Sequence, residues 1–78
     1  MPKTRRINSV DNHISKRMHD RRKAVGMTLE ELAENVHLTY QQIQKYERAI
    51  NRVPAARLYD VARALKVPIG YFFEGLPK

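Results

Sequence analysis

Two helix-start signatures stand eleven residues apart in this chain: Thr28 with Glu31, and Thr39 with Gln42. In such a capping box the Thr side chain accepts a hydrogen bond from the N–H three residues on, and the Glu or Gln accepts one from the N–H of the Thr. An apolar pair spans each start as a hydrophobic staple, Met27 with Leu32 and Leu38 with Ile43. Two starts this close leave room only for one short helix and a tight turn. Residues 28–49 are therefore predicted to form a helix-turn-helix.

The second helix of this motif has two chemically different faces. Ile43, Tyr46 and Ile50 recur at spacings of three and seven and are expected to face the core. The opposite face collects amide and basic side chains with an aromatic residue at its N-terminal edge: Gln41, Gln44, Lys45, Arg48 and Tyr40. Because Gln suits adenine and Lys suits guanine in the major groove, this face is predicted to contact DNA bases. A merely solvated polar helix surface is the alternative.

A first helix is expected before this motif. It should begin at Asp11 or Asn12, bury an apolar stripe formed by Ile14, Met18 and Val25, and end at Gly26. Arg22 lies within that stripe, four residues after Met18, and a charge placed there requires a buried partner.

Two further helices are expected after the motif. Pro54 suits the first turn of a helix whose apolar residues recur at three, four and seven: Leu58, Val61, Ala62 and Leu65. Pro68 opens a short fifth helix in which Ile69, Phe72 and Phe73 face the core or a partner. No stretch shows strand-like alternation, so the expected fold is all-α, with five short helices in one compact domain.

Length and charge restrict what such a domain does. With 78 residues and no cysteine, the chain has room for one core held by packing alone. We expect a flexible basic arm at residues 1–10, a folded domain at 11–75 and a frayed end at 76–78. No apolar run approaches the roughly 20 residues of a membrane span, so we expect no membrane contact and a cytoplasmic location.

Eight of the fifteen basic residues fall within residues 1–24, against two acidic ones, which favours a polyanionic partner over a merely soluble basic surface.

The N-terminal basic residues have open roles. Lys3, Arg5 and Arg6 either add phosphate or minor-groove contacts or belong to a terminus without function. Arg17 and Arg21 either contact the DNA backbone or form a solvated face.

Catalysis finds little support in the sequence. His13, His19 and His37 lack the spacing of a zinc site, no Cys is present, and there is no glycine-rich phosphate loop. We therefore expect no enzyme activity, no metal, no cofactor and no small-molecule ligand.

Residues 14–73 resemble the phage repressor and Cro type of helix-turn-helix, also called the xenobiotic response element (XRE) family. The resemblance rests on the run Arg22 to Thr28, on Leu32-Ala33, Leu38-Thr39 and Ile43 to Glu47, and on Leu58 to Leu65 with Val67. It implies a lambda-repressor-like domain of five helices that binds operator DNA, usually as a homodimer, with its third helix in the major groove. Leu29 departs from the family, because many members have a phosphate-contacting Gln there. His37 and Ala49 stand where many members have Gly.

The polar face of the motif's second helix and the family resemblance together assign the expected site residues. Base contacts are expected from Tyr40, Gln41, Gln44 and Lys45. Backbone contacts are expected from Thr39, Gln42, Arg48, Asn51, Arg52 and Arg17. Arg22 and Glu47 match a family pair that bridges the first and third helices, and the helical geometry also turns Glu47 toward the core edge near Arg22.

Two functional classes follow. The first is a sequence-specific transcriptional regulator, expected to be a repressor, which binds a palindromic double-stranded operator as a homodimer. The second is a protein-interaction module on the same scaffold, for example the antitoxin of a toxin–antitoxin pair.

Overall fold

Residues 7–76 are described by the computed structural model, and over this range the chain is helical without any strand. Four α-helices are followed by one 3-10 helix: α1 (Ser9–Ala24), α2 (Leu29–Asn35), α3 (Tyr40–Glu47), α4 (Ala55–Leu65) and η1 (Ile69–Phe73). The all-helical prediction is confirmed, but the count of five α-helices is wrong. The fifth segment, between Pro68 and Gly75, is a single 3-10 helix of five residues, the short form common in connectors and ends.

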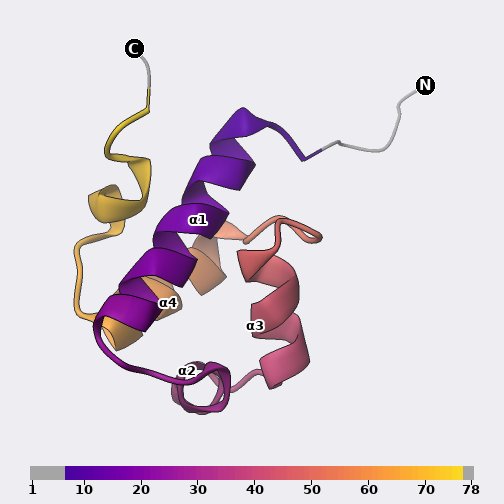
Figure 1. The fold of residues 1–78 in the computed structure, drawn as a ribbon, viewed down its shortest axis with the longest axis vertical. Coiled ribbons are helices and arrows are strands. Elements are labelled where there is room, and N and C mark those ends of the chain that lie inside the picture. Colours follow the sequence, from indigo (N-terminus) through magenta and orange to yellow (C-terminus); the bar gives the residue numbers. More distant parts are fainter. Residues whose placement is uncertain (1–6, 77–78) are drawn as a thin grey trace.

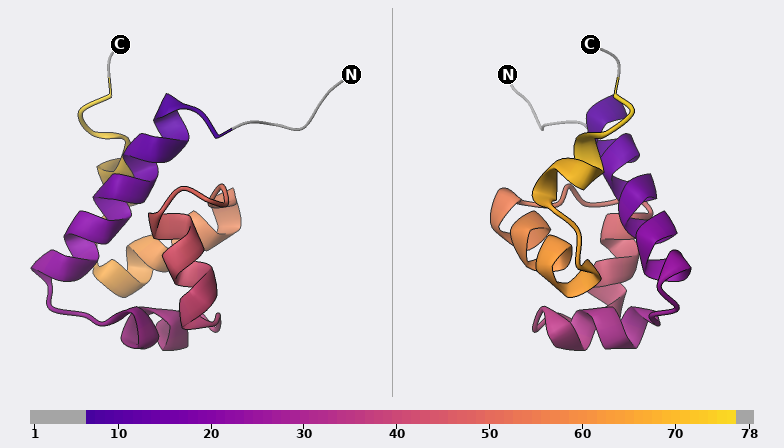
Figure 2. Two further views of the ribbon diagram at one scale, coloured as in Figure 1. Left: turned by 45° about the vertical axis from the view of Figure 1, so that its right-hand side comes forward. Right: turned by 90° about the vertical axis from the view of Figure 1, so that its left-hand side faces the viewer.

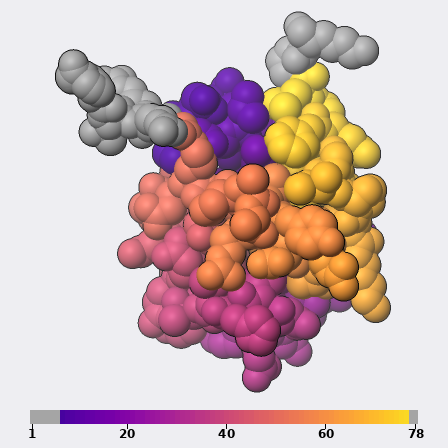
Figure 3. Space-filling model, turned by 180° about the vertical axis from the view of Figure 1, so that it is seen from behind, coloured from indigo at the N-terminus to yellow at the C-terminus, as the bar shows by residue number. Residues whose placement is uncertain are grey.

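The longest helix, α1, packs against three of the other four elements (Figures 1 and 2). It contacts α3, α4 and η1, while α2 lies across one end of the molecule and contacts α3 and α4. On the opposite face α4 and η1 form much of the surface, with α2 below them (Figure 3). None of the described helices is long and apolar enough to cross a membrane.

All four α-helices and η1 contribute to one hydrophobic core. Its largest fully buried side chains are Phe72, Met18, Leu32, Ile43, Leu65 and Val61. The predicted stripes are correct in the helix interiors and wrong at their ends. Val25 and Ile50 are 43% and 57% exposed, because each lies beyond the last residue of its helix, where helical periodicity no longer sets direction. Ile69 and Phe73 at the ends of η1 are each 42% exposed, and only Phe72 between them is fully buried.

Helix starts follow the predicted chemistry, with corrections. Thr28 and Glu31 form a complete capping box, with hydrogen bonds of 3.0 and 2.8 Å. The start of α1 was misplaced: Asn8 caps it in a second complete box with Asp11, so the helix begins at Ser9 rather than at Asp11 or Asn12. Asn8 three residues before Asp11 is the sequence signal of this start. Residues 1–6 of the predicted arm and residues 77–78 lie outside the described range.

The turns depend on left-handed backbone. Gly26 ends α1 with φ of 75°, as predicted, while His37 and Ala49 adopt φ of 59° and 57° where no glycine is present. Lys66 makes the same turn after α4 with φ of 59°. Pro54 and Pro68 occupy the cap position of their helices rather than the first helical position.

Candidate nucleic-acid interface

The inner face of α3 is fixed by the core. Ile43 is completely buried and Tyr46 is 6% exposed. Tight turn geometry sets the angle between α2 and α3, since His37 is left-handed and the N–H of Leu38 donates to the carbonyl of Ala33 at 2.9 Å. The outer face of α3 is therefore presented as a rigid surface. On it Tyr40, Gln41 and Lys45 are exposed, while Gln44 is half-buried.

A buried ion pair joins α1 to α3. The Arg22 guanidinium donates from Nε and Nη2 to the two carboxylate oxygens of Glu47, at 2.7 and 3.0 Å. Its Nη1 donates to the carbonyl of Met27 at 2.8 Å. The side chains are 9% and 4% exposed, so the structure brings together the two residues that the family pattern pairs, and both serve the fold.

His19 belongs to the same cluster and was not anticipated. Its Nδ1 lies 2.7 Å from Oε1 of Glu47, while the side chain is 47% exposed. The spacing from Arg22, three residues along the same helix, was the available signal, because such residues share a helix face.

The loop between α3 and α4 is held at two points. The Gln42 side chain does not complete the second capping box; the Thr39 hydroxyl accepts from the N–H of Gln42 at 3.2 Å, but the Gln42 amide donates to Oδ1 of Asn51 at 3.3 Å. Arg52 donates from Nε to both Asp11 oxygens at 3.0 Å. The predicted backbone-contacting residues Thr39, Gln42, Asn51 and Arg52 thus also shape the surface on which they lie.

The contact with Arg52 changes the pKa of the Asp11 carboxylate. Its hydrogen bond from Arg52 lowers its pKa below the ordinary value, partial burial opposes that effect, and the hydrogen bond from the Asn8 N–H adds to the lowering.

Arg17 does not face the same surface. Its Nε and Nη2 donate to the carbonyl of Tyr71 at 3.0 and 2.8 Å, and Nη2 lies 3.0 Å from a Glu74 oxygen. The guanidinium also stacks 3.8 Å from the centre of the Tyr71 ring. Because Nε and Nη2 are both committed to the Tyr71 carbonyl and to Glu74, we do not propose a DNA contact for Arg17. Arg21 is engaged similarly, donating to the carbonyl of Leu65 at 3.1 Å.

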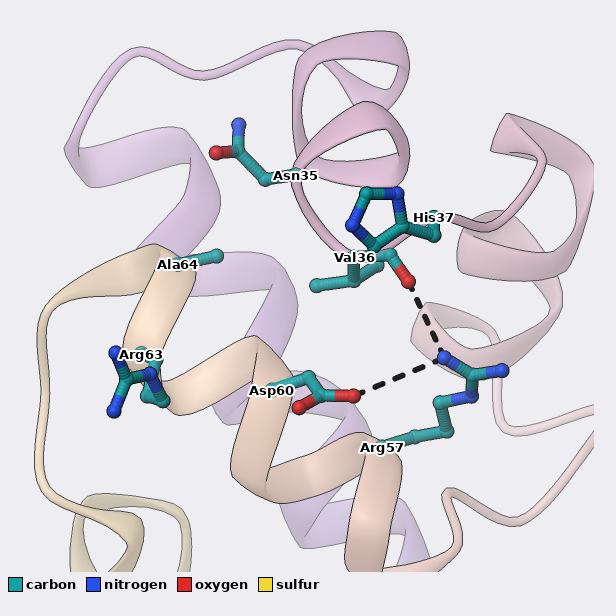
Figure 4. Close-up of a pocket in the computed structure, with 7 residues that line it drawn as sticks. All are labelled: Asn35, Val36, His37, Arg57, Asp60, Arg63 and Ala64. Carbon is teal, nitrogen blue, oxygen red and sulfur yellow. Dashed lines mark hydrogen bonds and ion pairs between the residues drawn. The ribbon is translucent and has the colours of Figure 1, made fainter.

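A hollow of about 370 Å³ lies between the C-terminal end of α2 and α4 (Figure 4). Arg57 reaches across it to the Val36 carbonyl at 3.2 Å and lies 3.8 Å from Asp60. None of the predicted DNA-contacting residues lines this hollow. The Arg57 guanidinium there satisfies the Val36 carbonyl at the end of α2. Within residues 7–76 no group of three or more His, Cys, Asp or Glu side chains is placed to hold a metal ion.

Comparison with known proteins places this arrangement in a family. The Helix-turn-helix family model HTH_3 matches residues 18–72. An uncharacterized transcriptional regulator in the ATPase CF(0) region of Rhodospirillum rubrum is 51% identical over 75 residues, covering 96% of this chain and 69% of that protein. The chain spans about half the length of several other regulators that it matches at 46% identity.

Solved structures share the fold. The clp gene regulator ClgR from Corynebacterium glutamicum superposes with a TM-score of 0.80 at 23% identity, over 85% of this chain and 86% of that one. The P22 c2 repressor in complex with a synthetic operator superposes with a TM-score of 0.73 at 22% identity, over 81% and 96%.

This chain belongs to the HTH_3, or XRE-type, helix-turn-helix family of DNA-binding transcriptional regulators. The family resemblance drawn from the sequence is thereby confirmed.

Proposed function

We propose that this chain binds a specific double-stranded DNA sequence with α3 in the major groove and regulates transcription from it, as a repressor. The single observation that carries this is the asymmetry of α3. Its inner face is locked by Ile43, Tyr46 and the Arg22–Glu47 pair, while its outer face presents only aromatic, amide and basic groups. A major groove admits one such helix.

Base contacts are assigned to Tyr40, Gln41, Gln44 and Lys45. Tyr40 and Gln41 begin α3, the end that reaches deepest into the groove when a recognition helix docks. Gln41 and Gln44 offer donor and acceptor together, as adenine requires, and Lys45 suits guanine.

Backbone contacts are assigned to residues that frame α3. Arg48 caps its C-terminal end and is exposed, and Asn51 and Arg52 follow in the loop. Thr39 and Gln42 lie at its start. Such contacts set the register of a protein on its duplex without choosing the sequence.

The proposed active form is a homodimer on a palindromic operator. Ile69 and Phe73 remain 42% exposed on η1, a position where two copies related by a two-fold axis would each bury an apolar side chain. Half-sites would then lie one helical turn apart, about 34–36 Å centre to centre. A cytoplasmic location gives such a protein access to its operator, and the P22 c2 repressor of the same fold was solved with a synthetic operator.

A randomised duplex library, selected with the protein and sequenced, tests the proposal. We expect one enriched palindromic motif whose binding weakens steeply with salt. Gln41→Ala should lower affinity for that motif by about tenfold and relax one base position. Arg63→Ala on α4 is the matched control and should change neither. A library with no enriched motif at low salt would overturn the proposal.

A further inference from the structure

A cleft of about 250 Å³ opens where α1, α2 and α3 meet. Its lining residues are His19, Arg22, Leu29, Gln44, Glu47 and Arg48. Gln44 belongs both to this cleft and to the outer face of α3, so the cleft borders the proposed DNA surface. Phosphates run along both edges of the major groove, and groups beside a helix docked there lie next to the backbone.

The accessible groups of the cleft include hydrogen-bond donors. The Glu47 side chain is 4% exposed. Its negative charge is balanced by the Arg22 guanidinium, which donates two hydrogen bonds to it. Arg48 is exposed, and no described residue forms a hydrogen bond or ion pair with its side chain. Leu29 offers no polar side-chain group, so an anion in this cleft would depend on Arg48, Gln44 and His19.

His19 is held in one orientation by Glu47. A carboxylate only accepts hydrogen bonds, so the 2.7 Å contact places a hydrogen on Nδ1 of His19. Nη2 of Arg22 lies 3.5 Å from the same nitrogen, too far to compete. With Nδ1 as the donor, Nε2 of a neutral ring carries a lone pair, which a phosphate repels. Only the protonated ring presents an N–H from Nε2.

We propose that this cleft seats one backbone phosphate of the bound duplex, that Arg48 and protonated His19 donate to it, and that DNA binding therefore takes up one proton from solvent at His19. This inference rests on the proposed function. It assigns His19 the backbone contact that Leu29 lacks the chemistry to make.

The charges around His19 set the balance of this proton uptake. Glu47 of α3 carries a negative charge beside the ring, and Arg22 of its own helix and Arg48 after α3 carry positive charges. Lys16 and Lys23 lie about one turn away on α1, and Lys16 is paired with Asp20. From α2 only the apolar Leu29 enters the cleft. A DNA phosphate adds a negative charge beside Arg48, so protonation of His19 becomes more favourable in the complex.

Fluorescence anisotropy on the selected duplex, from about pH 5.5 to 8.5 where histidines change charge, tests the inference. For the wild-type chain the association constant should rise toward lower pH by up to about tenfold per pH unit for each chain bound, the limit for one proton. His19→Gln should flatten this dependence and bind about tenfold more weakly at the acid end. His19→Lys, which keeps a permanent positive charge, should bind tightly with no such dependence. His37→Asn, at a position outside the cleft, should keep the wild-type dependence.

Duplexes that carry one uncharged methylphosphonate locate the contact. A substitution at one position per half-site should remove the pH dependence from the wild-type chain and leave His19→Gln unaffected. If His19→Gln keeps the wild-type pH dependence, or if no phosphate position removes it, the inference is overturned while the proposed function stands. If the wild-type chain selects no duplex, both are overturned.

Discussion

Arg22 and Glu47 lie 25 residues apart in the chain and form a two-pronged ion pair, with Nε to Oε2 at 2.7 Å and Nη2 to Oε1 at 3.0 Å. The pair connects the helix that organises the core with the helix that presents the candidate interface. Nη1 of Arg22 also donates to the Met27 carbonyl, directly before the cap of α2. One guanidinium therefore positions all three helices around the turn.

Removal of one partner of the Arg22–Glu47 pair should lower the free energy of unfolding by far more than the intact pair raises it. Glu47→Gln leaves the Arg22 charge buried without a counter-charge, and we expect the free energy of unfolding to fall by about 3 kcal/mol. For a domain of this size that lowers Tm by more than about 10 °C. Thermal and urea unfolding measure it, and a Tm within a degree of wild type would contradict the buried pair. The double variant Arg22→Met/Glu47→Leu should recover part of the loss, because it leaves no lone charge.

Acid should weaken the contact between α1 and the loop that follows α3. Arg52 lowers the pKa of Asp11 in the folded chain. The unfolded value is about 3.9. The stabilisation is therefore complete above that value and is lost as the pH falls through the lower, folded one. In urea unfolding between about pH 2 and 6, wild type should lose more stability than Asp11→Asn. Asp20→Asn, which removes an exposed i,i+4 pair with Lys16, should follow wild type.

Backbone strain at the end of α3 should be relieved by glycine. Ala49 has φ of 57°, a conformation in which its Cβ is unfavourable. Ala49→Gly should raise the free energy of unfolding by about 0.5–1 kcal/mol, since the relieved strain exceeds the extra entropy of the unfolded chain. Ala56→Gly in α4 is the matched control with opposite sign, expected to lower it by about 0.5–1 kcal/mol. If both substitutions destabilise, the strain at Ala49 is not real.

Much of this fold was predictable because its signals are local. The Thr28 capping box, the Gly26 stop and the interior stripes of α1 and α4 depend on neighbours within one or two turns. Val25 and Ile50 were misplaced because periodicity carries no information about where a helix ends. The exposed surface of α3 followed from the same periodicity. By contrast, His19 and Arg17 take their roles from partners 28 and 54 residues away, which no local pattern encodes.

Substitutions of Arg17 and Lys45 should distinguish a basic residue that stabilises the fold from one that contacts DNA. Arg17→Ala removes the hydrogen bonds to the Tyr71 carbonyl and should lower the free energy of unfolding by about 1–2 kcal/mol. Measured well below its Tm, this variant should keep the wild-type dependence of log K on log salt. Lys45→Ala should leave Tm nearly unchanged and alter DNA binding instead. A reduced salt slope for Arg17→Ala would return Arg17 to the DNA-contacting set.

The apolar surface of η1 should control assembly. Phe73 is 42% exposed while Phe72 beside it is fully buried, so a charge at Phe73 disturbs the surface without opening the core. Phe73→Glu should therefore keep Tm within a few degrees but shift sedimentation equilibrium from dimer toward monomer. Because a dimer joins two half-sites, the variant should lose affinity for the full palindrome and bind an isolated half-site as wild type does. Tyr59→Glu, at an exposed aromatic residue of α4, is the control and should remain dimeric. If Phe73→Glu sediments like wild type and binds the full palindrome equally well, η1 is not the surface through which the proposed dimer forms.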